Sequence, residues 1–168
     1  MSSIRSATPE DFDGLRRVFR ESDLQHSQAL PQVFRAPEPG EPLRSHGYLL
    51  EALQQEHAVI LVAEITTEIV GALHLSIRQA PDYWAFVPRQ YAWIDNVVVA
   101  AQCRRRGIAT ALFTHAHQWA AERGVSQIEL NVWNFNEDAI RFYESLGYET
   151  ASRRMWMTMH QDASRKDQ

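Results

Sequence analysis

The sequence predicts an α/β protein with a mixed β-sheet of six to seven strands, flanked by about four helices. Its 168 residues, 45% of them apolar, suffice for one domain with a core, which we expect to span residues 1–160 before a polar tail at 161–168. Apolar residues recur at helical spacing in some segments and form short Val- and Ile-rich runs in others. Their order places an antiparallel hairpin before a strand–helix–strand crossover, which predicts a mixed sheet with helices on both faces.

The N-terminal third predicts a strand, two helices and a loop. Ser3–Ala7 alternates as a short strand does. A threonine–proline pair with two acidic residues begins at Thr8 and predicts a helix start, and apolar spacing carries that helix to about Leu24. Prolines exclude a regular helix in Leu30–Pro42, so we expect a long loop there. Leu43–Glu56 is predicted to be the second helix.

The middle of the chain predicts three strands. His57–Ile65 and Ile69–Ile77 are rich in Val and Ile, and the turn Thr66–Glu68 joins them as an antiparallel hairpin. Pro81–Pro88 is an aromatic-rich loop whose side chains could line a pocket, pack on the sheet edge or contact a second subunit. Tyr91–Val99 ends in a continuous apolar run, which is typical of a strand buried on both faces.

The C-terminal part predicts a helix over Ile108–Arg123, which Gly124 ends. A strand over Gln127–Val132 follows. The next helix is expected over Glu137–Leu146, and one or two final strands over Tyr148–Met159.

The turn between the fourth strand and the third helix has the features of an anion site. A valine run is followed by three arginines and Gly107, and a small-residue helix begins at Ile108. A helix start leaves about four backbone N–H groups without intrahelical partners and carries partial positive charge. A phosphate is therefore the expected guest, and a glycine allows it to approach the backbone closely.

This turn resembles a known motif. The spacing Arg104-x-x-Gly107-x-Ala109 is similar to the acyl-CoA pyrophosphate loop of the GNAT N-acetyltransferase superfamily, whose pattern is Gln/Arg-x-x-Gly-x-Gly/Ala. A strand precedes it and a helix follows it, as in that family.

A second match lies downstream and resembles the closing segment of the same family. It reads Asn136-x-x-Ala139-x-x-Phe142-Tyr143-x-x-x-Gly147-Tyr148. The two matches occur in the family's order and at about its spacing. The resemblance covers roughly Ile4 to Met159 and implies the GNAT acyl-CoA N-acyltransferase fold.

The resemblance implies acetyl-CoA (coenzyme A) as the cofactor. The pantetheine arm would pair with the backbone of the fourth strand, and the amides of the turn would hold the pyrophosphate. The residues so assigned are Val97, Val98, Val99, Arg104, Arg105, Arg106, Gly107, Ile108, Ala109, Thr110 and Asn136. The three valines would also suit an ordinary buried strand. Asn136 would also suit a helix N-cap without a role in binding.

The family's chemistry is direct transfer from the thioester to an amine, and it suggests catalytic residues. By resemblance, Tyr143 protonates or stabilises the leaving sulfur, although a core aromatic would look the same. Asp95 is the candidate base, because an acid inside an apolar strand is costly to bury without a partner. A structural carboxylate is the alternative reading, and Glu64 and His74 on neighbouring strands are alternative bases.

Charge and composition disfavour other functions. The net charge of −4 argues against a general nucleic-acid surface. The single cysteine, Cys103, fits a reducing compartment, and it has no recognisable partner for a ping-pong mechanism. No secretory signal or membrane span is visible, so we expect a cytoplasmic protein. His115 and His117 point to different sides of a helix, and no metal site is predicted.

We therefore expect an N-acetyltransferase that acts on a primary amine of a small molecule, with a homodimer as a candidate assembly. Protein N-terminal or lysine acetylation, and a non-catalytic acyl-CoA-binding module, are the alternatives. The acceptor pocket is expected from Leu24–Tyr48 and Pro81–Pro88, with His26, Phe34 and Arg35 as candidate contacts or as plain surface residues.

Overall fold

The computed structural model describes residues 2–36, 38 and 44–159. Contacts within the chain divide it into two units, Met1–Asn131 and Val132–Gln168. The predicted tail at 161–168 and part of the predicted loop Leu30–Pro42 lie outside the described residues.

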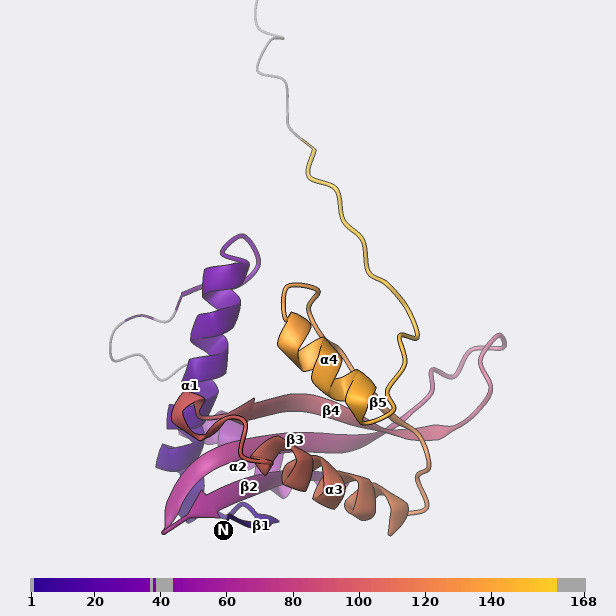
Figure 1. Ribbon diagram of the computed structural model, residues 1–168. Coiled ribbons are helices and arrows are strands. Elements are labelled where there is room, and N and C mark those ends of the chain that lie inside the picture. Colours follow the sequence, from indigo (N-terminus) through magenta and orange to yellow (C-terminus); the bar gives the residue numbers. More distant parts are fainter. Residues whose placement is uncertain (1, 37, 39–43, 160–168) are drawn as a thin grey trace, which may run out of the picture. The chain divides into compact units, whose positions relative to one another are not determined.

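The first unit contains a five-stranded mixed sheet in the order β1-β2-β3-β4-β5 (Figure 1). β1 to β4 pair antiparallel, and β5 pairs parallel with β4. The strands are β1 Ser3–Ser6, β2 Ala58–Ile65, β3 Glu68–Gln79, β4 Gln90–Val99 and β5 Ile128–Leu130. This sheet confirms the predicted α/β class, hairpin and crossover.

Among the described residues, three α-helices accompany the sheet in the first unit, and one lies in the second. They are α1 Phe12–Ala29, α2 His46–Gln54, α3 Ile108–Ala121 and, in the second unit, α4 Glu137–Ser145. Short 3-10 helices, Pro9–Asp11 and Ala101–Cys103, precede α1 and α3. The predicted cap at Thr8 is confirmed: the Asp11 carboxylate accepts a hydrogen bond from the Thr8 amide at 2.8 Å. α1 continues five residues beyond the predicted end at Leu24.

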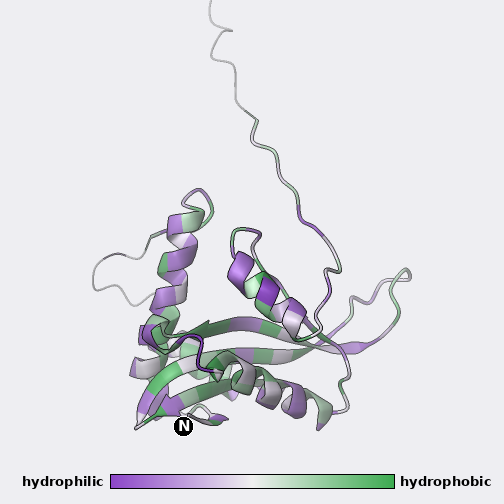
Figure 2. Ribbon diagram, in the orientation of Figure 1, coloured by the Kyte–Doolittle hydropathy of each residue, from purple (hydrophilic) through white to green (hydrophobic). Residues whose placement is uncertain are grey.

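α2 and α3 cover opposite faces of the sheet. A Cβ on Gly71 of β3 would lie 3.3 Å from Ile108 and 3.4 Å from Leu112, both on α3. His74, an odd number of residues along the same strand, faces α2 instead. The strands between these layers are mostly hydrophobic, whereas α4 is mostly hydrophilic (Figure 2). The missing side chain at Gly71 thus lets α3 lie close to the sheet, with its N-terminus following the end of β4.

The predicted final strands over Tyr148–Met159 are not formed. Residues 148–159 have no regular secondary structure, and Met155, Met157 and Met159 are exposed. Their alternation has the period of a strand, but a strand also needs a neighbour to pair with. Within the described residues this segment pairs with none, so the sheet has five strands instead of six or seven.

Gly14 is expected to be essential for the packing of α1. A Cβ there would lie 2.8 Å from Cγ1 and 2.9 Å from Cβ of Ile69. Gly14→Ala should therefore lower the free energy of unfolding by about 1–2 kcal/mol, despite the helix preference for alanine, as urea unfolding would measure. Gly47→Ala in α2 is the matched control, since its nearest atom would be the Ser45 hydroxyl at 3.8 Å. Equal stability of the two variants would contradict this close contact.

Candidate functional site

β4 contains a β-bulge at the residue that the sequence singled out. His74 pairs with Asn96 and Leu75 pairs with Ile94, so Asp95 is the extra residue. Bulges bend a strand and re-aim its side chains, and they are frequent beside active sites. Here Asp95 contacts Ser76 and Arg78 on the face covered by α2.

The pairing of β4 with β5 ends at this bulge. The last pair joins Ile94 to Leu130, which leaves β5 three residues long instead of the predicted Gln127–Val132. In the described residues, β4 has no strand partner on that side from Asp95 to Val99. The backbone groups of Val97, Val98 and Val99 therefore lie along a partly free strand edge, which an extended ligand can pair with.

The turn after β4 ends in the uncapped N-terminus of α3. Gly107 is the N-cap, with φ of 77° and ψ of 2°, and no side chain caps the helix among the described residues. A Cβ at Gly107 would meet no atom within 4 Å, so the backbone is open on that side. Arg105 also has positive φ, 63°, which turns the chain sharply before the helix. The predicted strand, basic turn and helix start are all present.

The three arginines of the turn have different surroundings. Nε of Arg104 donates to the backbone oxygen of Val99 at 3.1 Å, which ties the turn back to β4. Arg105 and Arg106 are exposed. The free amides of Ile108, Ala109 and Thr110 at the helix start, together with these charges, can bind an anion. Cys103 is buried behind the turn.

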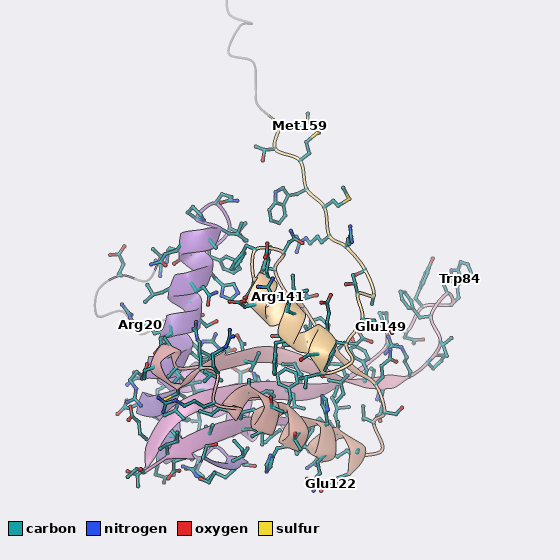
Figure 3. The ribbon with its side chains drawn as sticks, viewed as in Figure 1. Arg20, Trp84, Glu122, Arg141, Glu149 and Met159 are labelled. Carbon is teal, nitrogen blue, oxygen red and sulfur yellow. The ribbon has the colours of Figure 1, made fainter. Side chains whose placement is uncertain are left out.

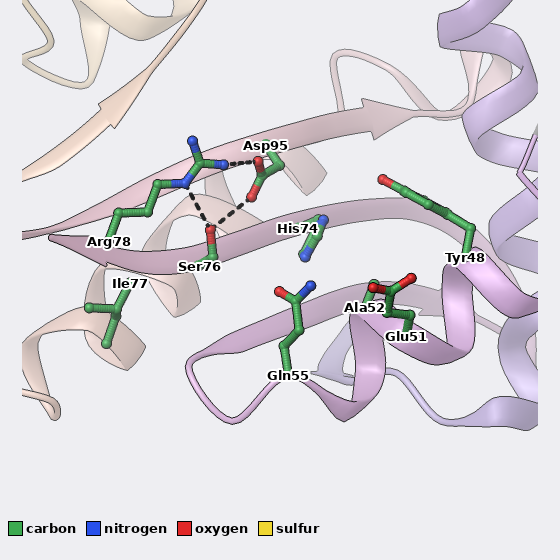
Figure 4. A pocket seen from close by; sticks show the side chains of 9 residues that line it. All are labelled: Tyr48, Glu51, Ala52, Gln55, His74, Ser76, Ile77, Arg78 and Asp95. Carbon is green, nitrogen blue, oxygen red and sulfur yellow. Dashed lines mark hydrogen bonds and ion pairs between the residues drawn. The ribbon is translucent and has the colours of Figure 1, made fainter. Parts of the chain in front are cut away.

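A polar pocket of about 420 Å³ lies between α2 and the bulged part of the sheet (Figure 4). It is formed entirely by the first unit, and its lining comes from α2, β3 and β4. The lining residues are Tyr48, Glu51, Ala52, Gln55, His74, Ser76, Ile77, Arg78 and Asp95. The volume is in the range of small-molecule sites.

Asp95 has the partners that a partly buried carboxylate requires. It forms an ion pair with Arg78 and accepts a hydrogen bond from the Ser76 hydroxyl at 3.0 Å (Figure 4). Arg78 also lies 4.9 Å from the ring centre of Trp93. These contacts offset the desolvation cost of the Asp95 carboxylate, and they fix it at the pocket wall.

His74, an alternative base in the sequence, lines the same pocket. Its side chain is 7% exposed, and no hydrogen-bond partner lies near its Nε2 in the described part of the chain. Burial lowers the pKa of the imidazole, while the negative charge of Asp95 opposes that shift. The ring is therefore neutral at pH 7, with an unused nitrogen.

Arg44 was not singled out by the sequence, yet it links α1 to the bulge of β4. Its guanidinium donates to Asp23 of α1 at 3.1 Å and to Oδ1 of Asn96 at 3.1 Å, and it lies 4.0 Å from the ring centre of Phe19. Its partners are distant in sequence, so no local pattern could reveal this role.

The second unit carries the two remaining predicted site residues. Asn136 caps α4 by accepting a hydrogen bond from the Ala139 amide at 3.4 Å. Tyr143 lies on α4 and is 9% exposed, and burial raises its pKa to about 12. Both residues belong to the second unit, and their roles toward a ligand stay predictions.

Other candidates lie outside the pocket. Glu64 forms an ion pair with Arg5 at 2.7 Å, so this alternative base belongs to a structural cluster. The rings of His26 and Phe34 stack edge to face, 5.2 Å apart. Tyr48, the last residue of the predicted acceptor segment Leu24–Tyr48, is an exception, because it lines the pocket described above. Trp84 is 87% exposed at the tip of the loop between β3 and β4 (Figure 3). The predicted packing of this aromatic loop on the sheet edge is therefore not formed.

Two further properties of the described residues bear on function. No three His, Cys, Asp or Glu side chains gather there as a metal ion would require. In the same residues, no helix combines the length and the hydrophobicity that a membrane span needs.

Comparison with known proteins gives consistent matches. The L-amino acid N-acetyltransferase AaaT of Escherichia coli (strain K12) is 26% identical over 154 residues, which cover 87% of this chain and 82% of that protein. The tetramutant of the BH1408 protein from Bacillus halodurans superposes with a TM-score of 0.87 and 27% identity, over 94% of this chain and 99% of that one. The chain spans under a third of the length of two other curated relatives, at 29% and 27%.

A more distant structure shares the fold alone. It is AAC(6')-Iy in complex with the bisubstrate analog CoA-S-monomethyl-acetylneamine, with a TM-score of 0.72 and 19% identity over 95% of this chain and 99% of that one. The profile of the Acetyltransferase (GNAT) family matches residues 23–148, which include the free edge of β4, the uncapped turn and the closing segment. The chain therefore belongs to the GNAT family of acetyltransferases.

Proposed function

We propose that this chain is an acetyl-CoA-dependent N-acetyltransferase that moves an acetyl group directly to a primary amine of a small molecule. The observation that supports it most is the uncapped N-terminus of α3, which follows the free edge of β4 after a short 3-10 helix and the arginine turn. An anion-binding helix start next to an unpaired strand edge suits a ligand with a diphosphate and an extended amide-bearing arm.

The residues of the turn and of β4 fit such a cofactor. The backbone of Val97–Val99 would pair with the arm, and the amides from Arg105 to Thr110 would hold the pyrophosphate. Arg105 and Arg106 would add charge, whereas Arg104 supports the turn through its bond to Val99. When bound, acetyl-CoA supplies the acetyl group as an activated thioester. A related fold that carries a CoA-containing analog is consistent with this assignment.

Three side chains would serve the reaction itself. Asp95 would assist removal of the amine proton, either directly or through a neighbouring group. Tyr143 would donate a hydrogen bond to the departing sulfur, because its raised pKa keeps the hydroxyl protonated at pH 7. Asn136 would bind the cofactor arm in addition to capping α4.

The size and polarity of the pocket favour a small-molecule acceptor over a protein. Its volume of about 420 Å³ suits a compact amine, and its lining offers carboxylate, amide, phenol and hydroxyl groups. The name of the Escherichia coli relative refers to amino acids, and the bisubstrate analog bound to AAC(6')-Iy joins CoA to an acetylneamine. Both are small-molecule amines, and we propose an acceptor of this size.

An amine panel with acetyl-CoA, read by release of free thiol, tests the proposal. We expect release above background with at least one polyamine, amino sugar or amino acid, and none with peptides. Release only with peptides would favour a protein acetyltransferase. CoA binding without thiol release against any member of the panel would favour a non-catalytic acyl-CoA-binding module.

A further inference from the structure

The pocket contains one polar atom that the rest of the protein does not use. Nε2 of His74 is buried and has no hydrogen-bond partner in the described residues. A buried nitrogen without a partner costs about 1–3 kcal/mol. In Figure 4 the ring lies at the centre of the pocket wall, between Tyr48, Gln55 and Ser76. Such an atom in the wall of a pocket indicates a ligand group that completes its hydrogen bonding.

Burial, helped by two nearby arginines, lowers the pKa of His74 and keeps its imidazole neutral at pH 7. Burial has the largest effect on its pKa and lowers it, and the positive charges of Arg44 and Arg78 lower it further. Asp95 on β4 opposes them. From α2, the pocket is also faced by Glu51 and by the phenol of Tyr48. A neutral imidazole can accept a proton, and the nearby carboxylate stabilises the cation that results.

His74 lies on β3, the strand next to the one that carries the free edge. Asp95 lines the pocket, and it is also the first residue of β4 beyond the last β4–β5 pair. His74 pairs with Asn96, the next residue along that edge. The pocket on one face of the sheet therefore meets the edge where the pantetheine arm is proposed to lie.

We propose that the pocket over β3 is the acceptor site and that Nε2 of His74 receives the proton which the attacking amine loses. This inference rests on the proposed acetyl transfer. Asp95 then acts as a positioning residue that stabilises the imidazolium by its charge, and it is not itself the proton acceptor.

The step balances without any further reactant. The lone pair of the amine nitrogen forms a bond to the carbonyl carbon of the thioester, and the nitrogen gives one proton to Nε2 of His74. The carbon–sulfur bond breaks, and its electron pair leaves on sulfur, which takes a proton from water to become the thiol. His74 returns its proton to water, so the products are the N-acetylated amine and CoA.

The charges of the pocket also indicate the class of amine. Arg78 is paired with Asp95, whereas Glu51 is exposed at α2 and forms no ion pair in the described residues. The pocket therefore has an excess of negative charge, which attracts a cation. We expect polyamines and amino sugars to bind better than amino acids, whose carboxylate meets Glu51 unfavourably.

The test compares His74→Gln with Asp95→Asn and with the control His57→Gln, an exposed histidine outside the pocket. His74→Gln should lower kcat/KM for the best amine by about a hundredfold or more and remove the acid limb of the pH profile, with CoA affinity unchanged. In Asp95→Asn the acid limb should move to lower pH, because the charge that raises the His74 pKa is gone. A wild-type rate and acid limb in His74→Gln would overturn the proposal.

A second measurement uses the wild-type protein, so it depends neither on catalytic turnover nor on the correct folding of a variant. NMR titration of the wild-type protein should show the His74 imidazole resonances moving when the best amine is added without acetyl-CoA. Unmoved His74 resonances at saturating amine would refute the pocket as the acceptor site. Absence of thiol release by the wild type with any amine would instead refute the proposed transferase function, which distinguishes the two failures.

Discussion

Replacing Gly107 by glutamate is expected to raise the dissociation constant for CoA by about a hundredfold or more. The new carboxylate would stand at the uncapped start of α3, where the pyrophosphate is proposed to bind, so it would repel the anion and compete for its amides. Loss of two charge-assisted hydrogen bonds alone corresponds to about 3 kcal/mol or more. Isothermal calorimetry with CoA measures the change.

The fold should survive this substitution. A Cβ at Gly107 would meet no atom within 4 Å, and a negative charge at a helix N-terminus stabilises the helix. The positive φ of 77° adds strain of about 1–2 kcal/mol for any other residue. Gly124→Glu is a matched control, because Gly124 follows the other end of α3 with φ of 72° and equally open space. Equal loss of affinity in both variants would contradict a specific role of the turn.

Replacing Tyr143 by phenylalanine is expected to lower kcat by about 10- to 100-fold while the CoA affinity stays within about twofold. Burial raises the Tyr143 pKa to about 12, well above the value of about 8.5 for an ordinary thiol. Full proton transfer to the thiolate is therefore unfavourable. A charge-assisted hydrogen bond to the developing negative sulfur is favourable, and its loss sets the expected size of the effect. Steady-state kinetics with saturating acetyl-CoA measures it.

Tyr148→Phe is the control for this prediction. The two rings lie 6.0 Å apart, and burial also raises the pKa of Tyr148, so the control removes a similar hydroxyl from the same unit. We expect little change in its kcat. An equal rate in Tyr143→Phe and the wild type would remove Tyr143 from the reaction and leave it as a packing residue beside Phe142.

The parts of the fold that depend on local sequence were predictable. Local sequence located the four described α-helices and the five strands that form, and the glycine after three arginines located the start of α3. The final strands over Tyr148–Met159 were predicted wrongly, because a stretch of sequence that could form a strand says nothing about a second segment to pair with. Strand formation needs that second segment, and a single sequence does not identify it.

The candidate site also has features that the local sequence predicts and features that it does not. Asp95 was predictable as unusual, because a charge within an apolar strand is visible in the sequence. Its ion pair with Arg78 and its place in a bulge depend on the register between β3 and β4, which local patterns do not specify. The roles of Arg44 and Glu51 likewise depend on contacts between residues that are far apart in the sequence.

The most direct test of the central claim is a crystal structure of the protein with CoA. We expect the pyrophosphate to accept hydrogen bonds from backbone amides between Arg105 and Thr110, with the pantetheine arm along β4 from Asn96 to Val99. A ligand bound elsewhere, with this turn empty at saturating CoA, would contradict the account.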